Sequence, residues 1–346
     1  MRLSRPLLLS VLLALGLAPA GAADAPAGNA VLQSPALHLE VAPHLGGRVV
    51  HLSVPGRGNV LRVGDLGVAP TVSASGGFIP YFGHEVWVGP QSQWWTSQDL
   101  NPGRRKAAAQ WPPDPWLAHG ANTVRAGDGQ HLLLEGRPSP VSGVQLTQSY
   151  RILPQRPDTA ELEVTMRNIR KQAVARDIWF NTRVDPRTRV YVPVEADGSG
   201  VRVRSDTGDG YDGLVSSSEG NLFSLELLPP GEGLQGRRGK VFIQPRAGWI
   251  AAFTRGQVLL IHFERQPAEL IHPEQGQVEL YLEWQAGRED QAGMMELEVH
   301  APFQSLAPGE SASAREWWVV RPYDGPDRRD AQVAFLQRLL GEVGIE

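Results

Sequence analysis

The sequence predicts an all-β protein made of large antiparallel sheets and ending in one helix. Apolar and polar residues alternate with period two in many segments, which is typical of strands that have one covered face. Glycine and proline account for 38 and 28 of the 346 residues and separate these segments with turns. A helical period appears only near the C-terminus, so we expect an all-β fold with a C-terminal helix.

Residues 1–23 have the layout of a secretory signal peptide. Arg2 and Arg5 precede an apolar run at residues 6–18, and small residues follow this run. The run is shorter than the roughly 20 residues that span a bilayer. There is also no cysteine to which a lipid could be attached. We therefore expect cleavage, no stable membrane anchor, and a periplasmic or secreted protein.

The rest of the chain is expected to form one domain. Residues 24–34 are small and polar and are expected to be a flexible lead-in, while residues 35–346 are expected to form a β-sandwich. The strand pattern is clearest at residues 144–152, 161–167 and 278–285. An apolar stripe at helical spacing predicts a helix over residues 327–341. The glycine-rich residues 197–213 are expected to be a long loop or a pair of turns.

Charge and composition exclude some partners. The formal charge of −4 is spread without a basic cluster, which argues against a nucleic-acid partner. No second apolar segment is long enough to cross a membrane. Because an exported protein without cysteine cannot use disulfides, its stability is expected to come from a hydrophobic core.

Tryptophan is concentrated in residues 83–116. Five of the ten tryptophans lie there: Trp87, Trp94, Trp95, Trp111 and Trp116. If these rings lie on loops, they can stack on sugar rings, while Glu85 and Gln91 hydrogen-bond to sugar hydroxyls. The alternative is that the rings plug the open end of a sandwich, and the sequence does not separate the two.

A strand is expected at residues 294–300. One of its faces carries Leu297 and Val299, and the other carries Glu296, Glu298 and His300. A carboxylate and an imidazole on one face can share acid–base catalysis, which typically contributes a factor of about 10² to 10⁴. A solvated polar face is the simpler alternative, because alternation alone predicts it.

The order of several motifs along the chain resembles a known superfamily. Near the N-terminus a Gly-Gly-Arg run at residues 46–48 precedes a β run. Near the C-terminus a glutamate-bearing strand is followed by Pro302, a turn at residues 306–310 and a last strand at residues 317–320. In these features the chain resembles an uncharacterised bacterial family of the galactose mutarotase-like superfamily, which contains the aldose epimerases. The resemblance implies a large antiparallel supersandwich with a sugar-facing groove, and it implies that Arg48 binds substrate.

The resemblance also implies catalytic roles. In aldose epimerases a C-terminal glutamate acts as base on the anomeric hydroxyl, and a histidine of a central strand donates to the ring oxygen. Glu298 matches the glutamate. Residues 177–181 match the central motif, but Asp177 stands where the family has histidine. Because an ionised aspartate cannot donate that proton at neutral pH, His84 and His300 are further candidates for the donor.

A cluster of aspartates raises the question of a metal. Asp206, Asp209 and Asp212 lie among glycines, and hard cations favour clustered carboxylates. The spacing does not fit an EF-hand, and tight turns select the same residue types. We expect neither a metal nor another cofactor.

Together these features predict an exported protein that recognises a carbohydrate. Its binding set is expected to include Trp87, Trp94 and Trp95, and if it converts a sugar, Glu298 is the expected base. An enzyme needs two proton-transfer groups on opposite sides of a sugar ring. The alternatives are a non-catalytic carbohydrate-binding protein and a scaffold protein of the envelope, which would present a broad apolar patch in place of a groove.

The signal-peptide interpretation predicts the N-terminus of the exported protein. Cleavage after the small residues should leave a first residue between Gly21 and Asp24. N-terminal sequencing of the protein secreted by an exporting host checks this. Finding Met1 on the exported protein, or the protein in salt-washed membranes, would contradict it.

Overall fold

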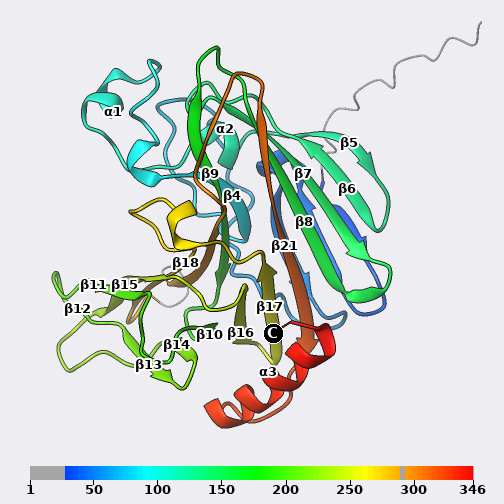
Figure 1. The fold of residues 1–346 in the computed structure, drawn as a ribbon, viewed down its shortest axis with the longest axis vertical. Coiled ribbons are helices and arrows are strands. Elements are labelled where there is room, and N and C mark those ends of the chain that lie inside the picture. The colour runs from blue at the N-terminus through cyan, green and yellow to red at the C-terminus, as the bar shows by residue number, and fades with distance from the viewer. Residues whose placement is uncertain (1–27, 289–292, 346) are drawn as a thin grey trace, which may run out of the picture.

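A computed structural model describes residues 28–288 and 293–345. Within these ranges two large β-sheets pack face to face, and helix α3 (Arg329–Val343) follows the last strand (Figure 1). The expected all-β sandwich with a C-terminal helix is confirmed. The expected signal peptide, residues 1–23, lies outside the described residues and stays a prediction.

The first sheet has eleven strands and carries a polar outer face. Its strands lie in the order β1 (Ala30–Gln33), β2 (His38–Ala42), β3 (Arg48–Ser53), β4 (His84–Gly89), β9 (Val174–Val184), β19 (Met294–His300), β18 (Val278–Gln285), β15 (Gly236–Ile243) and β11 (Val201–Ser205), with β12 (Tyr211–Asp212) on β15 and β20 (Gln304–Leu306) on β9.

The second sheet has ten strands. Its order is β13 (Val215–Glu219), β14 (Leu222–Glu226), β10 (Arg189–Pro193), β16 (Trp249–Thr254), β17 (Gln257–Phe263), β21 (Ser311–Pro322), β8 (Arg156–Asn168), β7 (Val144–Leu153), β6 (His131–Glu135) and β5 (Thr123–Gly127). Short helical segments complete the described chain: η1 (Pro43–Leu45), η2 (Gln91–Gln93), α1 (Pro102–Lys106), α2 (Pro115–Ala118) and η3 (Ala268–Leu270). No helix in the described ranges is long and apolar enough to cross a membrane.

The core lies between the two sheets, because the apolar side chains of each alternating strand point inward. Leu280 and Leu297 of the first sheet belong to the same buried cluster as Leu162 and Ile261 of the second. Burial of one such side chain typically stabilises a fold by about 1.5 to 3 kcal/mol. The pleat then leaves the intervening polar residues on the outer faces.

Helix α3 covers part of the outer face of the ten-stranded sheet. Its residues Leu336, Leu339 and Val343 are buried in a second cluster that includes Tyr191 and Phe253 of that sheet. Figure 1 shows α3 in red beside β16 and β17. Helix α3 therefore does not cover the outer face of the eleven-stranded sheet, on which Trp94 and Trp95 pack with Trp87 and Trp179.

Two local predictions are wrong. Strand β1 lies inside the expected lead-in, residues 24–34, because it pairs with β2 and buries Leu32 completely. Strands β11 and β12 lie inside the glycine-rich residues 197–213, which we expected to be loop or turns. In that segment the Val-Arg-Val-Arg alternation outweighs the glycines on either side, because it can pair with β15.

Candidate functional site

Polar side chains form two cross-strand rows on the outer face of the eleven-stranded sheet. Strand register aligns Arg202, Phe242, Glu279, Glu298, Asn181 and Glu85 in the first row. It aligns Arg204, Lys240, Tyr281, Glu296 and Arg183 in the second. Opposite residues of paired strands have Cβ atoms about 4.5 to 5.5 Å apart, so each row is a line of contacting side chains.

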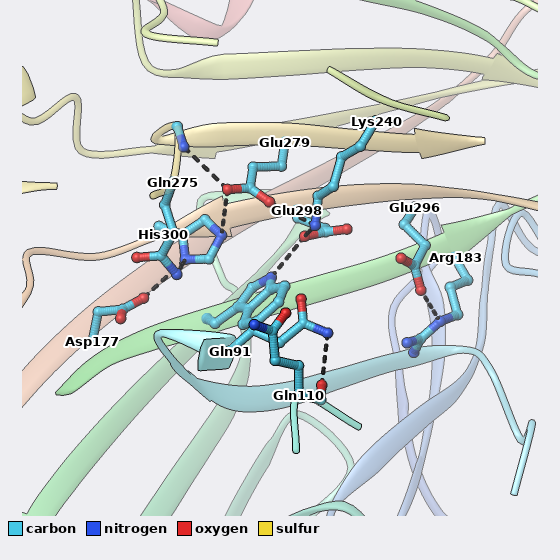
Figure 2. Close-up of polar contacts among 12 residues, drawn as sticks. Gln91, Gln110, Asp177, Arg183, Lys240, Gln275, Glu279, Glu296, Glu298 and His300 are labelled. Atoms are coloured by element: carbon cyan, nitrogen blue, oxygen red, sulfur yellow. Dashed lines mark hydrogen bonds and ion pairs between the residues drawn. The ribbon is translucent and has the colours of Figure 1, made fainter. Parts of the chain in front are cut away.

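Lys240 contacts two carboxyl groups in the middle of these rows. Its Nζ lies 2.6 Å from Glu279 Oε2 and 2.9 Å from Glu298 Oε2 (Figure 2). The Trp179 indole N–H also donates to Glu298 Oε2 at 3.0 Å. Although burial disfavours the ammonium ion, Glu298 and Glu279 outweigh burial and raise the pKa of Lys240. Lys240 therefore stays charged at neutral pH.

The pKa values of these two carboxyl groups are shifted in opposite directions. Burial raises the pKa of Glu298 to about 8, even though Lys240 acts to lower it. Burial also opposes ionisation of Glu279, but Lys240 and His300 outweigh it and lower the pKa of Glu279 to about 2. The arrangement therefore holds one firmly ionised carboxylate beside one that takes up a proton near neutral pH.

His300 lies next to this pair and is held by Asp177. Its Nδ1 is 2.8 Å from Asp177 Oδ2, and its Nε2 is 3.6 Å from Glu279 Oε1 (Figure 2). Burial acts to lower the pKa of His300, but Glu279 and Asp177 outweigh it and raise this pKa to about 9. Asp177, at the position where the resembling family has histidine, therefore accepts a hydrogen bond from His300.

A second ionic network lies on the other side of Glu298. Arg48 and Arg183 both pair with Glu85, and Arg183 Nε donates to Glu296 Oε1 at 2.8 Å. The charged partners outweigh burial and lower the pKa of Glu85 to about 2. Arg48 and Glu85, which we expected to bind substrate, are buried and use their charges to join β3, β4, β9 and β19.

Two adjoining pockets lie along the rows. The basic pocket, of about 580 Å³, contains Arg202, Arg204, Lys240, Phe242 and Glu279 among its lining residues. The aromatic pocket, of about 480 Å³, contains Phe78, Trp87, Trp111, Glu283 and Glu296. Both are lined by Gln91, Trp179, Lys240 and Tyr281, so we treat them as one groove. Glu298 is completely buried and lines neither pocket.

The tryptophan-rich segment contributes fewer groove residues than we expected. Trp94 and Trp95 are buried, and their indole N–H groups donate to the carbonyls of Val88 and Pro112 at 2.6 and 2.7 Å. Trp87 lies on strand β4 and lines the aromatic pocket, while Trp111 remains 48% exposed. Trp94 and Trp95 therefore pack in the interior, as the packing alternative predicts, because their segment folds back onto β4.

Gln91 does lie in the groove, as expected. It lines both pockets, and its side-chain amide donates to the Gln110 carbonyl at 2.9 Å (Figure 2). This bond fixes the amide beside Lys240 and leaves the side-chain carbonyl oxygen available as an acceptor.

His84 is not a partner of Glu298, and that prediction is wrong. Because successive residues of β4 alternate between faces, His84 points into the core while Glu85 points outward. Its Nδ1 is 2.8 Å from Thr182 Oγ1, and its ring centroid is 4.6 Å from that of Trp318. Burial lowers the pKa of His84 to about 3, so it stays neutral.

Several groove residues were missed by sequence reasoning. Lys240 and Phe242 alternate with buried Val241 and Ile243, a strand signal that we did not use. Glu279 lies on the outward face of a predicted strand, and Trp179 lies inside the motif matched to the epimerases. Arg202 and Arg204 were missed because their segment was assigned to turns.

One ligand atom from each of Glu279, Glu298 and His300 lies within 4.8 Å of the others, which is close enough for a shared cation. Lys240 already supplies the positive charge there, so a metal ion would have to displace its ammonium group.

Two of the three aspartates of the glycine-rich segment are paired with arginines. Asp206 pairs with Arg238 at 2.8 Å, and Asp212 pairs with Arg237 at 3.3 Å.

Comparison with known proteins identifies the fold. Residues 29–321 match the model of the family described as "Domain of unknown function (DUF4380)". The sequence matches no curated protein. Among solved structures, a galactose mutarotase-like protein from Lactobacillus casei ATCC 334 is similar, with 10% identity, a TM-score of 0.53 and coverage of 85% of this chain and 100% of that chain.

Two further structures agree. A protein from Escherichia coli K12, provisionally described as an aldose 1-epimerase, has 16% identity and a TM-score of 0.50 over 85% of this chain and 99% of that chain. The Slr1438 protein of Synechocystis sp. PCC 6803 has 14% identity and a TM-score of 0.50 over 88% of this chain and 100% of that chain. At these identities the likeness concerns the fold alone, which is galactose mutarotase-like.

The buried acids predict a decrease in stability with rising pH. Burial raises the pKa of Glu298 and of Glu316 to about 8, and the pKa of His300 is raised to about 9. Between pH 6.5 and 8 the folded protein holds protons that the unfolded chain has released, so stability is lost as pH rises through these folded pKa values. Each such group contributes on the order of 1 kcal/mol per pH unit.

Urea unfolding measured across this range checks the sign. Glu298→Gln should flatten the decrease in the free energy of unfolding, because it removes one of the titrating groups. Glu163→Gln changes a carboxylate on the outer face of the ten-stranded sheet and should leave the slope as it is. A slope that rises with pH, or that Glu298→Gln leaves unchanged, would show that Glu298 does not titrate as described.

Proposed function

Since the chain belongs to the DUF4380 family and has a galactose mutarotase-like fold, we propose that it is an exported protein that binds a carbohydrate in the groove. The signal-peptide layout of residues 1–23 supports export to the periplasm or medium. Two of the similar structures are described as a galactose mutarotase-like protein and an aldose 1-epimerase, and this favours a carbohydrate as the ligand.

One observation carries the proposal: the groove combines aromatic rings with polar groups fixed in place. Phe78 and Trp111 pack together at 4.7 Å between ring centroids, and Trp111 has one of the most exposed large apolar side chains in the described chain. Gln91, Lys240 and Tyr281 offer hydrogen-bonding groups beside these rings. Sugars present an apolar ring face and a hydroxyl edge, so a surface of this kind complements them.

The position of Glu298 favours binding over turnover. Its carboxylate is completely buried, ion-paired with Lys240 and hydrogen-bonded by Trp179. A general base must come within about 3.2 Å of the proton that it removes. Lys240 and Trp179, which line the groove, lie between Glu298 and a sugar there. The groove is also lined by charged groups rather than by the broad apolar patch of a scaffold.

The binding proposal makes a direct prediction for Trp111. Trp111→Ala should weaken saccharide binding by about 1 kcal/mol or more, which is at least about fivefold in Kd, because one stacking surface is lost. Calorimetric titration of the purified protein with gluco-, galacto- and manno-tetrasaccharides measures this. Trp317→Ala, on the ten-stranded sheet, is the matched control and should bind as the native protein does. If no tetrasaccharide binds, or if both variants lose affinity equally, the groove is not the binding site.

Turnover is the second candidate, and one observation favours it. Glu298 and His300 have pKa values raised to about 8 and about 9, near the range in which groups exchange protons at neutral pH. Within the described residues, Glu298 Oε1 has no hydrogen-bond partner. If Lys240 and Trp179 move aside when a sugar binds, Glu298 becomes a base and His300 an acid on the same face of the sheet.

This candidate predicts a specific loss in Glu298→Gln. If the protein converts a sugar, the substitution should lower kcat by at least about 10²-fold and leave binding largely intact. Glutamine has the same shape as glutamate but cannot accept the proton. Polarimetry and NMR on a panel of aldoses and oligosaccharides measure both forms. Glu163→Gln should keep full activity. A native protein that binds saccharides but converts none of the panel excludes turnover and leaves binding in place.

A further inference from the structure

The two ends of the groove carry different charged side chains, and only one of them has arginines. At the aromatic end, Glu283 and Glu296 lie beside Phe78 and Trp111. At the basic end, Arg202 and Arg204 extend from strand β11 at the edge of the sheet, with their residues exposed. They are two residues apart on one face of the strand, about 6.5 Å along it. The arginine pair therefore lies at one end of the groove only, and the two ends are chemically different.

The two arginines are not neutralised within the described chain. Three carboxylates share their pocket, and two of them have other partners: Asp206 pairs with Arg238 at 2.8 Å, and Glu279 pairs with Lys240 at 2.6 Å. The third, Glu274, forms no ion pair with either arginine. In residues 28–288 and 293–345, no carboxylate lies within ion-pair distance of either Arg202 or Arg204. Two guanidinium groups are thus left to bind an anion, and such groups match carboxylate and sulfate oxygens well.

Register and stacking hold this pair in place. Arg202 lies opposite Phe242 on β15, and its guanidinium lies 3.9 Å from the centroid of that ring. Arg204 lies opposite Lys240, the residue shared by both pockets. A ligand at the arginine pair is therefore one strand spacing from Lys240, and about 4.8 Å separates neighbouring strands.

We propose that the carbohydrate is an acidic oligosaccharide, with its carboxylate or sulfate at Arg202 and Arg204 and a neutral sugar unit at Trp111. This inference rests on the proposed binding function and specifies its ligand. The groove is also lined by carboxylates that would repel a densely charged chain: Asp206, Glu274, Glu279, Glu283 and Glu296. The ligand is accordingly a saccharide with an isolated acidic unit and at least one neutral neighbour.

Matched tetrasaccharides test the inference by calorimetry. The probes are neutral gluco-, galacto- and manno-tetraoses, the same chains with one uronate unit, and the same chains with one sulfate ester. The native protein should bind an acidic member at least tenfold more tightly than its neutral parent at low ionic strength, and 0.5 M NaCl should reduce this preference. Comparing the uronate and sulfate forms identifies which acidic group is preferred.

The arginines are tested in the same titrations. The double variant Arg202→Gln, Arg204→Gln should lose the preference for acidic chains and retain the affinity for neutral ones. Arg315→Gln, an exposed arginine of the ten-stranded sheet, should keep the preference. Neutral chains bound as tightly as acidic ones, or a preference that survives the double variant, would overturn the inference while the binding function stands. Failure to bind any probe would overturn both.

Discussion

The polar face of the eleven-stranded sheet depends on the contacts of the Lys240 ammonium group. It lies within 3 Å of the carboxylates of both Glu279 and Glu298, on two neighbouring strands. A buried charge that loses its partner typically costs about 3 to 5 kcal/mol. Lys240 also lines both pockets. The residue that stabilises the buried acids is therefore also the residue at which the two halves of the groove meet.

Local periodicity was enough to predict which face each side chain of β19 occupies. Glu296, Glu298 and His300 point to one side of β19, and Leu297 points to the core, because the pleat fixes alternation within a strand. Periodicity cannot show which strands are neighbours. Glu279 and Lys240 reach Glu298 only through the pairing of β15, β18 and β19, and this pairing follows from the whole sheet.

The tryptophan segment and the arginine strand show where composition misled us. Trp94 and Trp95 were expected to present their rings on loops, but the chain after β4 turns back and buries both rings. Arg202 and Arg204 looked like part of a turn, but they lie on a short edge strand. In each case the outcome depends on whether a distant part of the chain is there to cover or pair the segment, which local sequence does not contain.

Helix α3 and the groove lie on opposite sides of the molecule. It packs on the outer face of the ten-stranded sheet, and the groove lies on the outer face of the other sheet, so the sandwich separates the two. A tether attached after α3 therefore leaves the groove facing away from whatever holds it. The same geometry suits a biosensor surface, where coupling through the C-terminus would present every molecule with its groove toward the sample.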